Sequence, residues 1–251
     1  MSPDMEGRAG LVTGAAGGIG RASAVALGRA GASVVIADLE SEREGGEETT
    51  RLVEQAGGRA RFVACDVTRS DQVAHLVDAT VRAYGRLDFA HNNAGIGVQG
   101  RIVDMSEQDF DRCVAINLKG VWLGLKHELP RMLAAGAGAI VNTASLAGLI
   151  GLPQGGAYCA SKHGVVGITK TAAVEYAQRG IRVNAVCPAA IETRMTDALP
   201  DELRAQAVAP QAIKRFGRPD EVAAAVVWLC SDRASFITGA ALPVDAGATA
   251  W

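Results

Sequence analysis

A tyrosine and a lysine stand four residues apart, Tyr158 and Lys162, at the start of the helix-like stretch AYCASKHGVVGITKTAAVEYA. Side chains at positions i and i+4 of a helix share one face and can meet. A tyrosine alone keeps its proton until a pH of about 10, but a neighbouring ammonium group favours the phenolate and lowers that pKa. The pair could therefore exchange a proton with a hydroxyl group, or it could be an ordinary surface pair.

A glycine-rich turn, TGAAGGIGR, lies between the first predicted strand and the first predicted helix. At such a turn, backbone N–H groups and the helix N-terminus can receive a pyrophosphate. A Cβ atom at Gly14 or Gly20 would crowd the turn or the contact between helix and strand. The alternative is a simple tight turn, but the position between strand and helix favours a dinucleotide site.

Asp38 ends the second predicted strand, at about the distance where a dinucleotide-binding fold places its ribose carboxylate. A carboxylate accepts hydrogen bonds from a ribose 2′-hydroxyl and repels a 2′-phosphate, so Asp38 predicts NAD rather than NADP. Arg21 and Arg43 could still reach a phosphate, and Asp38 could instead cap the next helix. Asp66, after the third strand, could accept from an adenine amino group or cap a helix.

These residues require elements that bring them together, and short apolar strands alternate with helical segments along the whole chain. Strands are predicted at 9–14, 33–38, 60–66, 87–95, 139–145, 181–188 and 241–247, and helices at 18–32, 40–55, 71–84, 107–135, 157–178 and 219–231. Pro130 is expected to kink or end the fourth helix. The alternation predicts a single α/β domain over residues 1–251, a Rossmann-type doubly wound parallel sheet of about seven strands with helices on both faces.

The composition excludes several classes of protein. A net charge of -2 gives no basic field for nucleic acid or a membrane surface. The five cysteines have wide, irregular spacing without a Cys/His cluster, and the four histidines (His75, His91, His127, His163) lack ligand spacing, so no metal site is expected. The acidic start does not resemble a signal peptide, and no apolar segment is long enough to span a bilayer. A reduced, cytoplasmic protein is predicted.

In this order, the motifs resemble those of the classical short-chain dehydrogenase/reductase family, over nearly the whole chain. They are TGAAGGIG (13–20), CDV (65–67), NNAG (92–95), Asn117 in INLKG, Ser145 in NTASLAG and YCASK (158–162). The resemblance implies hydride transfer between a nicotinamide and an alcohol or ketone, with Ser145, Tyr158, Lys162 and Asn117 as catalytic residues. A surface role for the Tyr158–Lys162 pair is then disfavoured.

The resemblance also implies a role for each residue. Tyr158 exchanges the proton, Ser145 holds the substrate oxygen, Lys162 also holds the nicotinamide ribose, and Asn117 distorts its helix and binds a water linked to the lysine. Asn93 is expected to be structural. The implied cofactor contacts are Gly14, Gly18, Ile19, Gly20, Asp38, Leu39, Asp66, Val67, Asn92, Ala94, Gly95, Tyr158, Lys162, Pro188, Ile191 and Thr193.

One residue departs from the family pattern after the sixth strand. The family usually has Pro-Gly there, whereas this chain reads PAAIET, with Ala189 in place of the glycine. If that glycine normally adopts a backbone angle closed to alanine, the loop must differ locally. The contact of Ile191 and Thr193 with the nicotinamide carboxamide would then change as well.

Two segments are predicted to shape the substrate pocket. Residues 189–216 follow a strand end and form a candidate lid with Met195 and Leu199 on an apolar underside. Residues 146–156 supply a second wall with Leu146, Leu152 and Gln154, next to Ser145 and Tyr158. The expected substrate is an alicyclic, aromatic or otherwise apolar secondary alcohol or its ketone.

Three functions remain open. The first is an NAD-dependent alcohol dehydrogenase; the second is an NADPH-dependent reductase of the 3-oxoacyl-carrier-protein type, against which Asp38 argues. The third is a non-catalytic dinucleotide sensor, although such proteins usually lose the catalytic tyrosine or lysine. The family resemblance further implies a homotetramer, assembled through the 107–135 and 157–178 helices and the C-terminal segment.

Overall fold

A computed structural model of the chain describes residues 4–197 and 200–250. In these residues seven strands form one parallel sheet in the order β3-β2-β1-β4-β5-β6-β7, which confirms the predicted doubly wound α/β fold. The strands are β1 (Ala9–Thr13), β2 (Ser33–Asp38), β3 (Arg59–Ala64), β4 (Phe89–Asn92), β5 (Gly138–Thr143), β6 (Ile181–Pro188) and β7 (Ala241–Val244). The order reverses between β1 and β4, where open sheets of this kind leave a crevice at the carboxyl ends of their strands.

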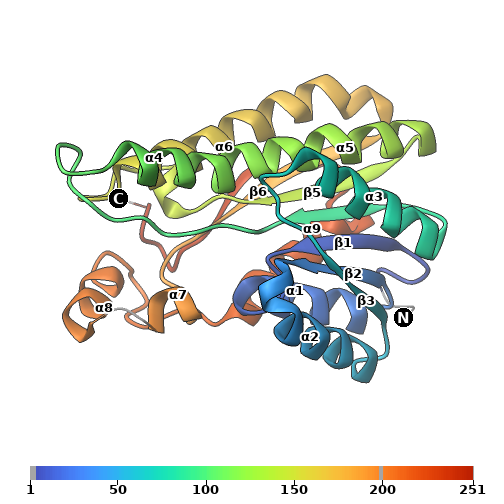
Figure 1. Ribbon diagram of the computed structural model, residues 1–251, viewed down its shortest axis with the longest axis horizontal. Helices are drawn as coiled ribbons and strands as arrows, with labels where there is room; N and C mark the ends of the chain where they lie inside the picture. Colours follow the sequence, from blue (N-terminus) through green and yellow to red (C-terminus); the bar gives the residue numbers. More distant parts are fainter. Residues whose placement is uncertain (1–3, 198–199, 251) are drawn as a thin grey trace.

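Helices cover both faces of the sheet (Figure 1). The helices are α1 (Gly18–Arg29), α2 (Arg43–Gln55), α3 (Ser70–Tyr84), α4 (Glu107–Val114), α5 (Gly120–Ala135), α6 (Gly156–Tyr176), α7 (Arg194–Asp197), α8 (Asp201–Val208) and α9 (Pro219–Cys230). One face carries α1, α2 and α9, and the other carries α3, α5 and α6. In the described part of the chain no helix is long and apolar enough to cross a membrane.

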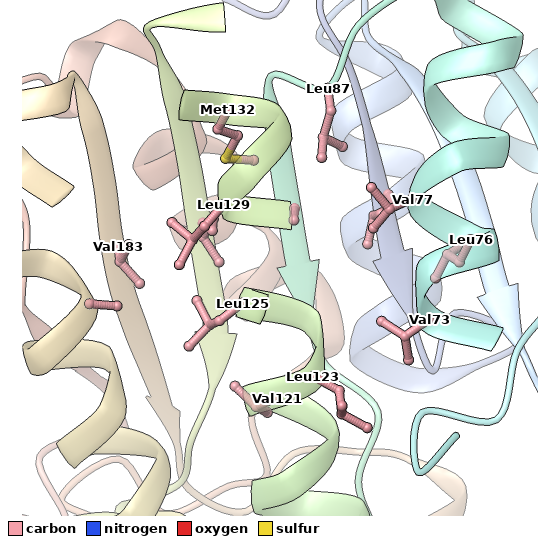
Figure 2. Packing of buried hydrophobic residues seen from close by; sticks show 14 of the residues in the cluster. Val73, Leu76, Val77, Leu87, Val121, Leu123, Leu125, Leu129, Met132 and Val183 are labelled. Atoms are coloured by element: carbon pink, nitrogen blue, oxygen red, sulfur yellow. The ribbon is translucent and has the colours of Figure 1, made fainter. Parts of the chain in front are cut away.

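Successive side chains of a strand point to opposite sides of the sheet, and helices cover both sides, so the strands β1, β2, β4, β5 and β6 are buried on both faces. In β1, Leu11 joins the cluster beneath α3, α5 and α6, whereas Val12 joins the cluster beneath α1 and α9. Figure 2 shows the first cluster, in which Leu125, Leu129 and Met132 of α5 pack against the sheet. Each such fully buried side chain contributes about 1.5–3 kcal/mol, so this packing fixes the strand ends in place.

The predicted helix over 107–135 differs from the observed one in two ways. Pro130 does not end it, because α5 continues to Ala135. The burial of Leu129 and Met132 on either side of the proline offsets the helical hydrogen bond that proline cannot donate. The helix also contains a π-helical segment, Ala115–Lys119, between α4 and α5.

Candidate active site

A cleft of about 840 Å³ opens at the carboxyl ends of the central strands. The turns after β1, β2, β3, β4, β5 and β6 line it, together with the end of α4, the π-helical segment, the first turns of α6 and the segment that begins α7. This volume is in the range of small-molecule and cofactor sites. Among the described residues, no group of three or more His, Cys, Asp or Glu side chains could hold a metal ion.

Tyr158, Lys162 and Ser145 meet in this cleft. The Lys162 Nζ atom lies 5.7 Å from the centre of the Tyr158 ring and donates a hydrogen bond to the Thr143 carbonyl oxygen at 2.8 Å. Ser145 follows β5, and its Oγ accepts from the Ala147 N–H at 3.1 Å. The end of one strand and the first turns of one helix therefore place the three functional groups side by side.

Burial governs the charge state of this group. Burial lowers the pKa of Lys162 from its usual 10.5 to about 8. Burial also raises the pKa of Tyr158, an effect that a hydrogen bond with the Ser145 side chain only partly counters. From the sequence we expect Lys162 and the oxidised nicotinamide together to lower the tyrosine pKa, but among the protein's own groups burial has the larger effect. Tyr158 therefore carries its proton here and can donate it.

Asn117 lies in the π-helical segment, with its side chain fully buried. Its Oδ1 accepts from the Ile96 N–H at 2.8 Å, and its Nδ2 donates to the Ile96 carbonyl at 2.9 Å and to Ser161 Oγ at 3.2 Å. The Ser161 hydroxyl donates in turn to the Tyr158 carbonyl at 2.7 Å. Asn117 thus connects the turn after β4 to the first turn of α6, and π-helical bulges are frequent at functional sites.

The glycine turn has the close backbone approach that its sequence predicts. Gly14 has a φ of +63°, and a Cβ atom there would lie 2.8 Å from Ala94 Cα. A Cβ atom at Gly20 would lie 2.2 Å from the Gly14 carbonyl oxygen, so neither position accepts a larger residue. Gly17 precedes α1 without a side-chain cap, and the first turn of α1 has no acidic residue. The positive end of α1 is therefore open to an anion.

Asp38 both lines the cleft and supports this turn. Its Oδ2 accepts from the Ala16 N–H at 2.8 Å and its Oδ1 from the Leu39 N–H at 2.9 Å, while the next helical turn has no side-chain cap. Neither Arg21 nor Arg43 lines the cleft. Arg21 donates to the backbone oxygens of Ala16 and Gly45, and Arg43 pairs with Glu40.

Most of the predicted cofactor residues line the cleft. These are Gly14, Gly18, Ile19, Asp38, Leu39, Asp66, Val67, Ala94, Gly95, Tyr158, Lys162, Pro188, Ile191 and Thr193. Asp66 also accepts from the Thr68 N–H and hydroxyl at 2.9 and 2.7 Å, in a local turn. A Cβ atom on Gly95 would lie 3.2 Å from Asn117 Oδ1 and 3.5 Å from Lys162 Nζ, so Gly95 passes directly over both groups.

Two predicted cofactor residues do not line the cleft. Gly20 is buried against the turn, and Asn92 points into the core, where its Nδ2 donates to Glu128 Oε2 and Asn142 Oδ1, both at 3.1 Å. The Asn92 side chain therefore faces the core, and the cofactor contact expected for this residue stays a prediction. Asn93 lines the cleft instead, and its Nδ2 holds the Thr13 and Gly14 carbonyls at 3.0 and 3.2 Å, in keeping with its expected structural role.

Two buried titratable side chains lie behind the cleft. Glu128 of α5 is 1% exposed, and burial raises its pKa to about 7 although Asn92 donates to it. His91 of β4 is fully buried, and burial lowers its pKa to about 3. Its Nε2 lies 2.8 Å from Thr143 Oγ1. Neither group lines the cleft.

Some of the predicted substrate residues line the cleft and others do not. Ser145, Tyr158 and Met195 line the cleft, whereas Leu146, Leu152 and Gln154 do not. Leu146 is buried, Leu152 is 37% exposed, and Gln154 has a φ of +61° in the loop before α6. Leu199 lies outside the described residues. The loop positions differ from expectation because sequence adjacency to Ser145 does not determine which way a turn directs its side chains.

Ala189 does not distort the loop after β6. Its φ is not positive, and its N–H donates to the Val244 carbonyl at 3.3 Å. This position thus accepts alanine without strain, and Ile191 and Thr193 still line the cleft.

Sequence reasoning missed several residues that line the cleft. These are Ala16, Gly17, Glu42, Cys65, Thr68, Ile96, Arg112, Ala115, Ile116, Thr143, Ala144, Arg194 and Thr196. Most are chain neighbours of predicted residues and could have been found by extending each motif by one or two positions. Glu42 and Arg112 could not, because helix geometry alone brings them to the rim.

The chain is similar to several known oxidoreductases. A family model described as "Enoyl-(Acyl carrier protein) reductase" matches residues 14–249. The chain is 45% identical to cis-4-hydroxycyclohexanecarboxylate dehydrogenase of Sinomonas cyclohexanicum, over 97% of each chain. It is 40% identical to 3-oxoacyl-[acyl-carrier-protein] reductase of Thermotoga maritima, over 97% of this chain and 98% of that one. The crystal structure of levodione reductase superimposes with a TM-score of 0.92 at 38% identity, covering 98% of this chain and all of that one.

Proposed function

Because the chain belongs to the classical short-chain dehydrogenase/reductase family, we propose that it transfers a hydride between NAD(H) and an apolar secondary alcohol or its ketone. The chain is an oxidoreductase of alcohols that uses a nicotinamide dinucleotide, as its relatives indicate. The observation that carries the proposal is the meeting of Tyr158, Lys162 and Ser145 beside an open glycine turn in one cleft.

In the proposed reaction the protein handles the proton and the substrate oxygen. The bound nicotinamide would supply or accept the hydride. Tyr158 holds its proton because burial raises its pKa. When a ketone is reduced, Tyr158 donates this proton to the ketone oxygen; when an alcohol is oxidised, the phenolate takes the hydroxyl proton. Ser145 holds that oxygen by a hydrogen bond. Lys162, with its pKa near 8, stands beside the tyrosine to favour the phenolate when the proton leaves.

Asn117 is proposed to act behind this group. Its amide oxygen and the Lys162 ammonium both lie under Gly95, as the 3.2 and 3.5 Å contacts of a Cβ at that position indicate. A polar group here can carry hydrogen bonds from the lysine toward solvent. Asn117 also keeps the turn after β4 in place through its two bonds to Ile96.

The cofactor is proposed to be NAD(H) rather than NADP(H). Asp38 places a carboxylate at the end of β2 in the cleft, and Arg21 and Arg43, the two cations that could have offset it, are engaged elsewhere. A carboxylate accepts from a ribose hydroxyl and repels a phosphate. The remaining contacts proposed for the dinucleotide are those predicted residues that line the cleft.

The substrate is proposed to be an alicyclic or otherwise apolar secondary alcohol. The similarity to a dehydrogenase of a hydroxylated cyclohexane ring supports this class, and Met195 adds an apolar side chain to the cleft. A Cβ atom on Gly97 would lie 3.3 Å from the Met195 sulfur, so this methionine packs over the turn after β4. The similarity to the acyl-carrier-protein reductase keeps NADPH-dependent reduction of a 3-oxoacyl group as the second candidate.

A homotetramer is also proposed. Large apolar side chains are exposed on the helices that the family uses for assembly, with Phe110 of α4 44%, Trp122 of α5 46% and Val174 of α6 83% exposed. Large apolar side chains exposed on these helices support an interface there. Light scattering coupled to gel filtration tests this, and a monomer at micromolar concentration would contradict it.

The proposal is tested by following cofactor reduction with NAD and NADP in parallel over a panel of cyclic, aromatic and acyclic secondary alcohols. The panel includes 4-hydroxycyclohexanecarboxylate and cyclohexanol, and Tyr158→Phe serves as the control. Reduction of NAD, abolished by Tyr158→Phe, is the expected result. A preference for NADPH with 3-oxoacyl thioesters would favour the second candidate. Binding of cofactor without turnover in either direction would favour a sensor.

A further inference from the structure

Arg194 begins α7 directly above the glycine turn, and the proposed reaction gives it no role. A Cβ atom placed on Gly18 would lie 3.1 Å from Thr193 Cγ2, and one placed on Gly17 would lie 4.0 Å from Arg194 Nε. Figure 1 shows α7 beside the start of α1. The guanidinium therefore stands close to the open N-terminus of α1, where a pyrophosphate is expected.

Arg194 is held in this place by an acidic residue on the opposite rim. Its Nη1 lies 2.9 Å from Glu42 Oε2, in an ion pair that joins α7 to the 3₁₀ turn before α2. Both residues line the cleft, so the ion pair crosses it. The side chains are 73% and 40% exposed, and an ion pair this exposed is weak. A ligand with stronger charge complementarity can take the guanidinium away from Glu42.

The other cations of the cleft either donate a hydrogen bond elsewhere or lie on a helix away from the glycine turn. Among the described residues that line it, the cations are Arg112, Lys162 and Arg194. Lys162 donates to the Thr143 carbonyl next to Tyr158, and Arg112 lies in the last turn of α4, away from α1. Of these three cations, only Arg194 lies within 4.0 Å of a Cβ atom placed on a glycine of the turn, Gly17. A pyrophosphate carries two negative charges, and guanidinium groups bind phosphates through paired, charge-assisted hydrogen bonds.

We propose that Arg194 binds the pyrophosphate of the dinucleotide and that Glu42 competes with the pyrophosphate for the same guanidinium. The inference rests on the proposed function only in requiring that the cleft binds a dinucleotide. Arg194 is then a cofactor-binding residue that fastens the start of α7 over the glycine turn. Glu42 opposes binding, because its partner must be released before the pyrophosphate is held.

Equilibrium binding separates these roles without any turnover. ADP-ribose, which has the pyrophosphate but no nicotinamide, is titrated by calorimetry, and NADH by its fluorescence. The variants are Arg194→Gln, Glu42→Gln and the double variant. The matched control is Arg51→Gln, because Arg51 of α2 is similarly exposed, at 65%, pairs with Glu48, and does not line the cleft. Thermal unfolding of each variant checks that the fold is retained.

The expected dissociation constant for ADP-ribose and NADH rises about 5-fold in Arg194→Gln and falls about 3-fold in Glu42→Gln, as for partly exposed charge contacts. The double variant should bind like Arg194→Gln, since Glu42 acts through the arginine. Arg51→Gln should bind like the wild type. Raising the salt concentration should reduce the difference between wild type and Arg194→Gln.

Three results would overturn the inference. If Arg194→Gln binds both ligands as tightly as the wild type, Arg194 does not hold the pyrophosphate. If Glu42→Gln tightens binding equally in the presence and absence of Arg194, the carboxylate repels the ligand directly and does not compete for the arginine. If the wild type binds ADP-ribose, NADH and NADPH at none of the tested concentrations, the proposed function itself fails, and this inference fails with it.

Discussion

The inner wall of the cleft, formed around Lys162, is buried and hydrogen-bonded, whereas its outer mouth, formed around Met195, is exposed to solvent. On the inner wall, Lys162 is 3% exposed, and directly behind it Asn117 is fully buried. Each side chain donates a hydrogen bond to a backbone carbonyl group. At the mouth, Met195 is 48% exposed. Substitutions on the inner wall should therefore change stability and catalysis together, whereas those at the mouth should change substrate choice with little effect on stability.

The largest effect is expected for Lys162→Met, which should lower kcat/KM about 1000-fold and yet stabilise the fold. Burial lowers the lysine pKa from 10.5 to about 8. Below pH 8 the lysine is charged in the folded and unfolded protein, and burying that charge costs stability. Between pH 8 and 10.5 only the unfolded chain keeps the proton, so the cost fades. After the lost bond to Thr143, we expect a gain of about 2 kcal/mol at pH 7.

Urea unfolding at pH 7 and pH 10 measures this gain. It should be clear at pH 7 and small at pH 10. A variant that is less stable than the wild type at pH 7 would show that the hydrogen bond to Thr143 outweighs the buried charge.

Asn117→Ala should destabilise the fold, whereas Lys162→Met should stabilise it, although Asn117 lies directly behind Lys162. It removes the partner of both backbone polar groups of Ile96, which are partly buried, and a buried polar group left unpaired costs about 1–3 kcal/mol. The free energy of unfolding should fall by about 2 kcal/mol and kcat/KM by about 100-fold. Comparison of urea midpoints with Lys162→Met tests this, and unchanged stability would mean that water replaces the amide.

Asp38→Asn tests the inner wall at its cofactor end. An asparagine has a single acceptor oxygen, whereas Asp38 accepts from the N–H groups of both Ala16 and Leu39. The ratio of NADPH to NADH dissociation constants should fall about 10-fold, because the repulsion of a 2′-phosphate is removed. Fluorescence titration with both cofactors measures the ratio; if it does not change, Asp38 does not set the preference.

Outside the cleft, in the loop before α6, Gln154→Gly should have the smallest effect. Gln154 adopts a φ of +61°, which glycine reaches without steric cost. The variant should be more stable by about 0.5 kcal/mol, since the flexibility of glycine in the unfolded chain offsets part of the relief. Its kcat should stay within about twofold of the wild type, because a residue that does not line the cleft is not expected to stabilise the transition state. A large loss of kcat would show that Gln154 acts on the reaction from outside the cleft walls and would contradict this prediction.

The sequence predicted the inner wall better than the mouth. The fold class, the strands and the positions of Gly14, Asp38 and Tyr158 follow from local patterns, because strand ends and helix starts are marked by residue type. The orientation of Asn92 does not, since the face to which a strand-end side chain points depends on the register of the whole strand. The ion pair between Glu42 and Arg194 joins segments about 150 residues apart, and no local pattern encodes it.

The two buried titratable groups behind the cleft have opposite consequences for the pH dependence of folding. Glu128, with its pKa raised from 4.5 to about 7, stabilises the fold less as pH rises from 4.5 toward 7, because only the folded protein keeps the proton. His91, with its pKa lowered from 6.5 to about 3, destabilises the fold as pH falls from 6.5 toward 3, because only the unfolded chain takes up the proton. Between pH 4.5 and 6.5 these two slopes oppose and cancel.

The titrations of Glu128 and His91 therefore offset each other. Together they should change the melting temperature little between pH 4.5 and 6.5. Glu128→Gln removes one slope and leaves that of His91, about 1.4 kcal/mol per pH unit at most. The melting temperature of the variant should then rise from pH 4.5 to 6.5, while that of the wild type rises much less. Equal slopes for the two proteins would show that Glu128 is ionised in the fold throughout this range.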